Sequence, residues 1–179
     1  HGAGPYRLLV HGDAGPQNCL WTGDEVRLID FEFGTFGYGP LDVVSARLGF
    51  PHSEEAARVP TSVVNELEAR YRYEITKAEP ASADEDTFRT AIVDACAHWS
   101  LGRLSGLWNP LFLPALTAGS SMSERTWLSL SQAMTVFQGF IDVAALYKRR
   151  SVLATTLDAA VTEIQVRLPG LEAAPLYAA

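Results

Sequence analysis

Three oxygen-bearing side chains, Asp13, Asn18 and Asp30, have the types and spacing to do chemistry together. Asp13 and Asn18 bound the loop "DAGPQN", and Asp30 ends the second of two apolar runs that come after it. Oxygen ligands without a cluster of cysteine and histidine favour Mg²⁺ over zinc. If the three side chains converge, one acid can orient a hydroxyl nucleophile while the amide and the second acid hold the magnesium of a nucleotide.

A β-hairpin must bring these residues together. Two strand-like runs, Asn18–Thr22 and Val26–Asp30, are separated by the turn signal Gly23-Asp24-Glu25. A three-residue loop makes the leucines of the two runs face each other, which a buried face favours, and places Asn18 opposite Asp30. A two-residue Gly23-Asp24 turn is equally allowed and shifts the pairing by one residue, so that Gln17 faces Asp30. Both registers end the second strand beside Asn18.

The rest of the sequence predicts an α+β protein in which helices come after the strands. Tyr6–Val10 is expected to be another strand, and the glycine-rich "FGTFGYGP" a loop. The expected helices are "LDVVSARLGF" after Pro40, "VVNELEARYRYEI" opened by Thr61 or Ser62, "DTFRTAIVDACAHWSLGRL" capped by Ser82 with Glu85, "RTWLSLSQAMTVFQGFIDVAALYK" capped by Ser121 with Glu124, and Val152–Leu168. The segment "LWNPLFLPALTAG" is expected to be irregular and partly buried.

Composition indicates one domain over residues 1–179, with 171–179 as a loosely held tail. The net charge of −7 argues against nucleic-acid and anionic-membrane partners. No run is long enough to span a bilayer and no signal-peptide pattern is present, which favours a cytoplasmic location. Cys19 and Cys96 are expected to be buried free thiols.

The spacing of the polar residues matches a known catalytic arrangement. His11-Gly12-Asp13 precedes Asn18 with the H-x-D-x-x-x-x-N spacing, and Asp30-Phe31-Glu32 comes later as D-F-x. This is the spacing of the catalytic and metal-binding loops of protein kinases. Asp13 or Asn18 alone would more often cap a turn than react. The conjunction of spacing, hairpin and strand-end acid favours chemistry.

Residues 8–47, "VHGDAGPQNCLW…VRLIDFEFGTFGYGPLDVVSARL", resemble the aminoglycoside phosphotransferase and choline kinase family of small-molecule kinases. The resemblance implies a protein-kinase-like C-terminal lobe, mostly helical, with a small antiparallel hairpin carrying the active-site loop. It implies transfer of the γ-phosphate of ATP or GTP to a hydroxyl of a small molecule. Asp13 would be the catalytic base, and Asn18 and Asp30 would bind Mg²⁺ and, through it, the nucleotide.

The resemblance also implies supporting roles nearby. His11 would brace the loop by hydrogen bonds, and Asp42 would hold the active-site backbone. Glu32 is a possible substrate or second-metal residue. The acidic chain, with Glu32 near the loop, mildly suits a cationic acceptor such as an aminoglycoside or amino alcohol.

Parts of a complete kinase are missing from this sequence. Such enzymes cover the phosphates with a glycine-rich loop and pair them with a strand lysine. The only lysines, Lys77 and Lys148, lie in no such strand. We therefore expect the chain to be one lobe that works with an N-terminal lobe in cis and is nearly inactive alone. The alternative is a noncatalytic, truncated kinase-like module that binds a ligand or a partner.

Other polar and aromatic residues favour structural roles. Neither His52 nor His98 has a metal-type partner at a suitable spacing. Trp99 and Trp108 are expected to pack in the core rather than line a pocket. Lys148-Arg149-Arg150 lies at a predicted helix end, where the helix dipole explains positive charge.

Overall fold

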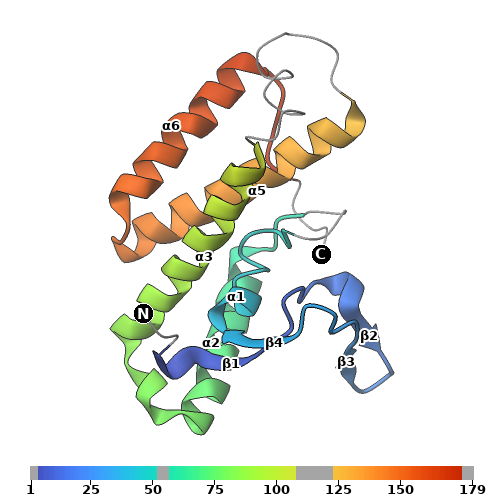
Figure 1. Cartoon of the computed structure of the whole chain (residues 1–179), viewed down its shortest axis with the longest axis vertical. Coiled ribbons are helices and arrows are strands. Elements are labelled where there is room, and N and C mark those ends of the chain that lie inside the picture. Colours follow the sequence, from blue (N-terminus) through green and yellow to red (C-terminus); the bar gives the residue numbers. More distant parts are fainter. Residues whose placement is uncertain (1–3, 52–56, 108–122, 175–179) are drawn as a thin grey trace.

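The computed structural model describes residues 4–51, 57–107 and 123–174. The predicted α+β organisation is confirmed: short strands come first, and helices make up most of the remaining chain. Figure 1 shows the small β-structures at one edge and the longer helices beyond them. Within the described ranges, no helix combines the length and apolar character needed to cross a membrane.

The strands form two separate antiparallel pairs. β1 (Arg7–Val10) pairs with β4 (Thr35–Tyr38), and β2 (Cys19–Trp21) pairs with β3 (Val26–Leu28). The prediction that "FGTFGYGP" is wholly loop is therefore wrong, because β4 lies within it. Glycine signals a loop locally, but the backbone groups of β1 need partners, and β4 supplies them. Gly37 suits this pairing because a Cβ there would lie 3.2 Å from Val10 Cγ2.

Of the two registers that the sequence allowed, the hairpin adopts the one with the two-residue turn. Trp21 pairs with Val26, and Leu20 faces Arg27 rather than a leucine. Gly23 has φ +91°, a left-handed conformation that suits so tight a turn. The three-residue register is wrong because both faces of this hairpin are exposed, so no buried face selects leucine against leucine.

Within the described residues, the helical part has one four-residue helix and four long ones. They are α1 (Pro40–Val43), α2 (Thr61–Ala78), α3 (Glu85–Leu107), α5 (Glu124–Tyr147) and α6 (Ser151–Arg167). The helix expected after Pro40 stops at Val43 and continues as turns to Gly49. The last helix agrees with its prediction to one residue at each end. Single-turn 3-10 segments, Gly4–Tyr6, Pro16–Asn18 and Pro80–Ala83, connect other elements.

The caps of two long helices differ from the predicted capping boxes. The Asp84 carboxylate, not Ser82, accepts the N–H of Thr87 at 2.7 Å at the start of α3. Ser82 is fully buried in the preceding turn and donates to the Glu79 carbonyl. Ser123 caps α5 by accepting the N–H of Thr126, while the predicted cap Ser121 lies outside the described residues. Spacing alone could not choose between neighbouring polar residues.

The core lies where α3, α5 and α6 pack side by side (Figure 1). Ile92 of α3, Phe137 and Phe140 of α5 and Leu157 of α6 are all buried. Cys96 is buried in this core as expected, whereas Cys19 is exposed because β2 buries neither face. Trp99 is half-buried and donates from Nε1 to the Leu41 carbonyl at 3.2 Å, which ties α3 to α1.

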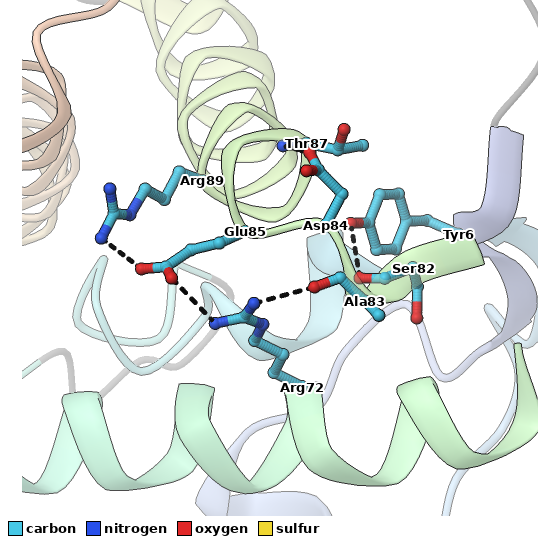
Figure 2. Close-up of polar contacts among 8 residues, drawn as sticks. All are labelled: Tyr6, Arg72, Ser82, Ala83, Asp84, Glu85, Thr87 and Arg89. Carbon is cyan, nitrogen blue, oxygen red and sulfur yellow. Dashed lines mark hydrogen bonds and ion pairs between the residues drawn. The ribbon is translucent and has the colours of Figure 1, made fainter. Parts of the chain in front are cut away.

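Polar contacts join the 3-10 segment before β1 to the helices, as Figure 2 shows. The Tyr6 hydroxyl donates to the Ser82 carbonyl at 3.4 Å, just before α3. Arg72 on α2 donates to the Ala83 carbonyl at 2.9 Å and lies 3.8 Å from the Glu85 carboxylate. Arg89 also pairs with Glu85. The turn before α3 is thus the meeting point of the Gly4–Tyr6 segment, α2 and α3.

The arginines after α5 do more than complement a helix dipole. Arg150 pairs with Asp94 through two hydrogen bonds of 2.8 and 3.0 Å, and Arg149 pairs with Asp86. Both acids lie on α3, so these contacts tie the α5–α6 connection to that helix.

The beginning of the expected C-terminal tail packs against the helices. Leu171 and Ala174 are buried, and the Ala174 N–H donates to Thr135 Oγ1 at 2.7 Å. Residues 175–179 lie outside the described residues. So do "WNPLFLPALTAG", His52 and Trp108.

Candidate functional site

The loop between β1 and β2 brings Asp13 and Asn18 into direct contact. Asn18 Nδ2 donates to the Asp13 carboxylate at 2.9 Å and to the Asp13 carbonyl at 2.8 Å. The backbone turn is closed by Gly15 N–H on the Asp13 carbonyl and Asn18 N–H on the Gly15 carbonyl. Gln17 Nε2 donates to the other carboxylate oxygen of Asp13 at 3.3 Å. The acid is therefore oriented from one side by two amides.

The orientation of the Asn18 amide is set by its neighbours. Both atoms facing Nδ2 are acceptors, so the amino group must point at them and both of its hydrogens are used. Asn18 Oδ1 is left without a partner among the described residues, although the side chain is only 7% exposed. A held, unpartnered amide oxygen is a suitable ligand for a hard cation.

His11 links the loop to the end of the hairpin. Its Nε2 lies 2.8 Å from the Ile29 carbonyl, and its Nδ1 lies 3.3 Å from the Asp13 N–H. Because a carbonyl only accepts, Nε2 carries the proton and Nδ1 accepts. The ring is buried and lies 4.4 Å, centroid to centroid, from the ring of Phe31. The predicted bracing contact is therefore present in the structure.

Asp42 holds the backbone at the other side of the loop. Its two carboxylate oxygens accept the N–H groups of His11 at 2.6 Å and of Gly12 at 3.0 Å. Asp42 lies in the first turn of α1, so this contact also connects the loop to the helical part. Charged acceptors make such hydrogen bonds stronger than neutral ones.

The backbone conformation at Gly12 explains why glycine stands between His11 and Asp13. Its φ of +83° lies in the region that favours glycine, and a Cβ there would come within 2.8 Å of the Phe33 carbonyl oxygen and Cβ. The loop thus packs backbone against backbone on the segment after Asp30. Any larger residue would push the two apart.

Asp30 lies beside this loop but does not contact its side chains. The strand ends at Leu28, and Ile29 continues the pairing by donating its N–H to the Asn18 carbonyl at 3.0 Å. Asp30 comes next with φ +63°, a left-handed conformation uncommon outside glycine. Its carboxylate makes no hydrogen bond or ion pair with any described residue. The expected strand-end position is therefore corrected: Asp30 lies two residues past the strand.

Glu32 is exposed in the turn between Asp30 and β4 and makes no side-chain contact within the described ranges. Its sequence neighbours Phe31 and Phe33 are exposed as well.

Sequence reasoning missed an apolar surface around the loop. Nine of the exposed large apolar side chains fall within residues 9–36: Leu9, Leu20, Trp21, Val26, Leu28, Ile29, Phe31, Phe33 and Phe36. They lie on both faces of the β2–β3 hairpin, in β1 and in the segment from Ile29 through β4. The available signal was the apolar content of both hairpin strands, which by itself predicts burial rather than exposure.

The chain matches no protein-family model, and a comparison with curated proteins finds no relative. The assignment of the site therefore depends on its own geometry. In the described part of the chain, no group of three or more His, Cys, Asp or Glu side chains is arranged to hold a metal ion. An amide and one or two carboxylates completed by a ligand's phosphates would suffice for Mg²⁺.

Proposed function

We propose that this chain is the catalytic-loop lobe of a small-molecule kinase with a protein-kinase-like fold. It would transfer the γ-phosphate of ATP or GTP to a hydroxyl of a small-molecule acceptor such as an aminoglycoside or amino alcohol. The observation that carries the proposal is the orientation of Asp13 by Asn18 and Gln17 in a loop with the H-x-D-x-x-x-x-N spacing.

The proposed role of each side chain depends on which of its polar atoms have no hydrogen-bond partner. Asp13 keeps lone pairs beyond the two amides and would accept the proton of the acceptor hydroxyl. His11 and Asp42 leave the loop backbone little freedom, which preserves the position of Asp13. This is positioning catalysis, since phosphoryl transfer requires little covalent chemistry from the protein.

The donor set fits a magnesium ion. Asn18 Oδ1 and the Asp30 carboxylate are unpartnered oxygen ligands, among the described residues, in adjoining segments. The hydrogen bond from Ile29 N–H to the Asn18 carbonyl already brings these two segments together. When bound, Mg²⁺ would neutralise charge on the phosphates of the nucleotide.

The apolar surface favours a second covering unit. The nine exposed apolar side chains around the loop would be covered by the base of the nucleotide and by an N-terminal lobe in cis. The same surface is the observation that supports the alternative, a noncatalytic module that binds a partner there. The two proposals differ in whether nucleotide binding and phosphate transfer depend on Asp13 and Asp30.

Isothermal titration calorimetry with ATP, with and without Mg²⁺, tests the proposal on this chain. We expect weak binding that requires Mg²⁺, and loss of this Mg²⁺-dependent binding in Asp30→Asn. Asp24→Asn removes a charge from the turn of the same hairpin and serves as the matched control, with unchanged binding. Asp13→Ala should retain nucleotide binding and abolish any phosphate transfer. Binding that is independent of Mg²⁺ in the wild type and unchanged in Asp30→Asn would favour the noncatalytic module.

A further inference from the structure

A polar pocket between α2, α5 and the segment before α2 is distinct from the loop site. Its volume is about 260 Å³, and none of its lining residues belongs to the Asp13 loop. This is below the roughly 300–1,000 Å³ of pockets for drug-sized ligands. The polar side chains that line it are Arg47, Arg58, Thr61, Thr135, Gln138 and Asp142.

Arg47 lines this pocket and has one donor nitrogen that no described residue binds. The side chain is 9% exposed, and its Nε and Nη2 donate to the Glu68 carboxylate at 2.6 and 2.7 Å. Nη2 also approaches Asn65 Oδ1 at 3.4 Å, which leaves Nη1 with no partner among the described residues. The guanidinium of Arg47 is thus paired with Glu68 through Nε and Nη2 and has one terminal nitrogen that no described residue binds.

The remaining charges of the pocket are separated and balanced. Glu68 already offsets Arg47. Arg58 uses Nε to bind the Ala174 carbonyl at 2.8 Å, and its two terminal nitrogens are unpartnered within the described ranges. Asp142 accepts one hydrogen bond, from Gln138 Nε2 at 2.8 Å. Arg58 and Asp142 form no ion pair with each other, so the pocket presents one free positive and one free negative group.

We propose that this pocket binds a small zwitterion of the α-amino acid class. The carboxylate would be bound by Arg47 Nη1 and Arg58, and the ammonium group by Asp142. A simple anion would have to approach Asp142, and a simple cation would have to approach Arg58, so each leaves one charge unmatched. The start of α2 at Thr61, where no side chain caps the first N–H groups, adds donors on the carboxylate side.

The test is calorimetric titration of the wild-type chain with each of the standard L-amino acids in turn. At least one should bind with a Kd below about 1 mM. Its C-terminal amide and its N-acetyl form, each lacking one charge, should bind about tenfold more weakly. Inorganic phosphate should bind no better than these analogues.

Variants then test which residue binds each charged group of the amino acid. Arg58→Gln should weaken the free amino acid about tenfold but leave the amide unchanged, because the amide has no carboxylate to lose. Asp142→Asn should weaken the free amino acid and spare the N-acetyl form. Arg70→Gln, on the exposed face of α2, is the matched control.

Three outcomes would overturn the proposal: no amino acid binding with a Kd below about 1 mM, phosphate binding as well as the best amino acid, or Arg58→Gln weakening the acid and its amide equally. The analogue series on the wild-type chain decides the matter even if a variant fails to fold. None of these outcomes bears on nucleotide binding at the Asp13 loop.

Discussion

At the scale of single residues, Asp30 combines an unusual backbone with an unpartnered charge. Its left-handed φ of +63° costs free energy that a non-glycine residue recovers only through surrounding structure. Asparagine tolerates this conformation because its short polar side chain can form local hydrogen bonds, and glycine tolerates it because it has no Cβ. Alanine has neither advantage. Backbone and charge effects at this position can therefore be separated.

We expect Asp30→Asn to change the free energy of unfolding by less than about 0.5 kcal/mol, and Asp30→Ala to lower it by about 1 kcal/mol. Asp30→Gly should be no less stable than Asp30→Ala. Urea denaturation measures these differences, and calorimetry measures Mg²⁺-dependent nucleotide binding, which all three should lose. Retained Mg²⁺ dependence in the stable Asp30→Asn would remove Asp30 from the proposed site.

His11 is the residue on which the loop geometry depends most. Replacing it by alanine removes the bond to the Ile29 carbonyl and the acceptor for the Asp13 N–H in a buried place. We expect His11→Ala to lower the free energy of unfolding by about 1–3 kcal/mol, measured by urea denaturation. A change within experimental error would mean that the two backbone groups find water instead.

At the scale of elements, the start of α3 depends on Asp84. Hydrogen bonds from the Thr87 side chain and backbone hold the pKa of the Asp84 carboxyl below its usual value. A lowered folded-state pKa means that the charge stabilises the fold above the ordinary pKa and that this stabilisation is lost as the pH falls through the lowered one.

We therefore expect Asp84→Ala to lower the melting temperature at neutral pH, with the difference from wild type narrowing below about pH 4. Asp84→Asn keeps a capping oxygen without the charge, so its smaller deficit should vary less with pH. Thermal melts measured by circular dichroism from pH 2 to 7 test both. An Asp84→Ala deficit that stays constant into acid would show that the cap works through its oxygen alone.

At the scale of the whole molecule, a buried ion pair connects the turn after α1 to α2. Both side chains of the Arg47–Glu68 pair are nearly excluded from solvent. Burial alone would lower the pKa of Arg47, but the hydrogen bonds and charge of Glu68 raise it overall. The turn carrying Arg47 comes directly after Asp42 and α1, so this pair supports the same segment that holds the candidate loop.

Glu68→Gln should leave the buried guanidinium uncompensated and lower the free energy of unfolding by about 3–5 kcal/mol. The double variant Arg47→Met with Glu68→Leu should recover most of that loss, because no buried charge remains. Denaturant unfolding of the two variants gives the comparison. A small effect of Glu68→Gln would show that water reaches the pair.

Local sequence patterns were sufficient to predict part of this structure. Helix-start and helix-stop residues in the sequence predicted α2, α3, α5 and α6 close to their observed bounds, although the caps of α3 and α5 are other residues than predicted. The sequence placed Asp13 and Asn18 in one short loop, and the hydrogen bond that the structure shows between them closes within that loop. The turn at Gly23-Asp24 was likewise predicted from its residues.

Only the tertiary structure decided the rest, because those features depend on partners distant in sequence. β4 forms in a glycine-rich segment since β1 lies beside it, and the hairpin takes its register without a buried face to select one. The left-handed Asp30, the pocket around Arg47 and the exposure of Cys19 depend on which surfaces meet. Local residue patterns specify the elements, but long-range packing determines which polar atoms remain free to bind.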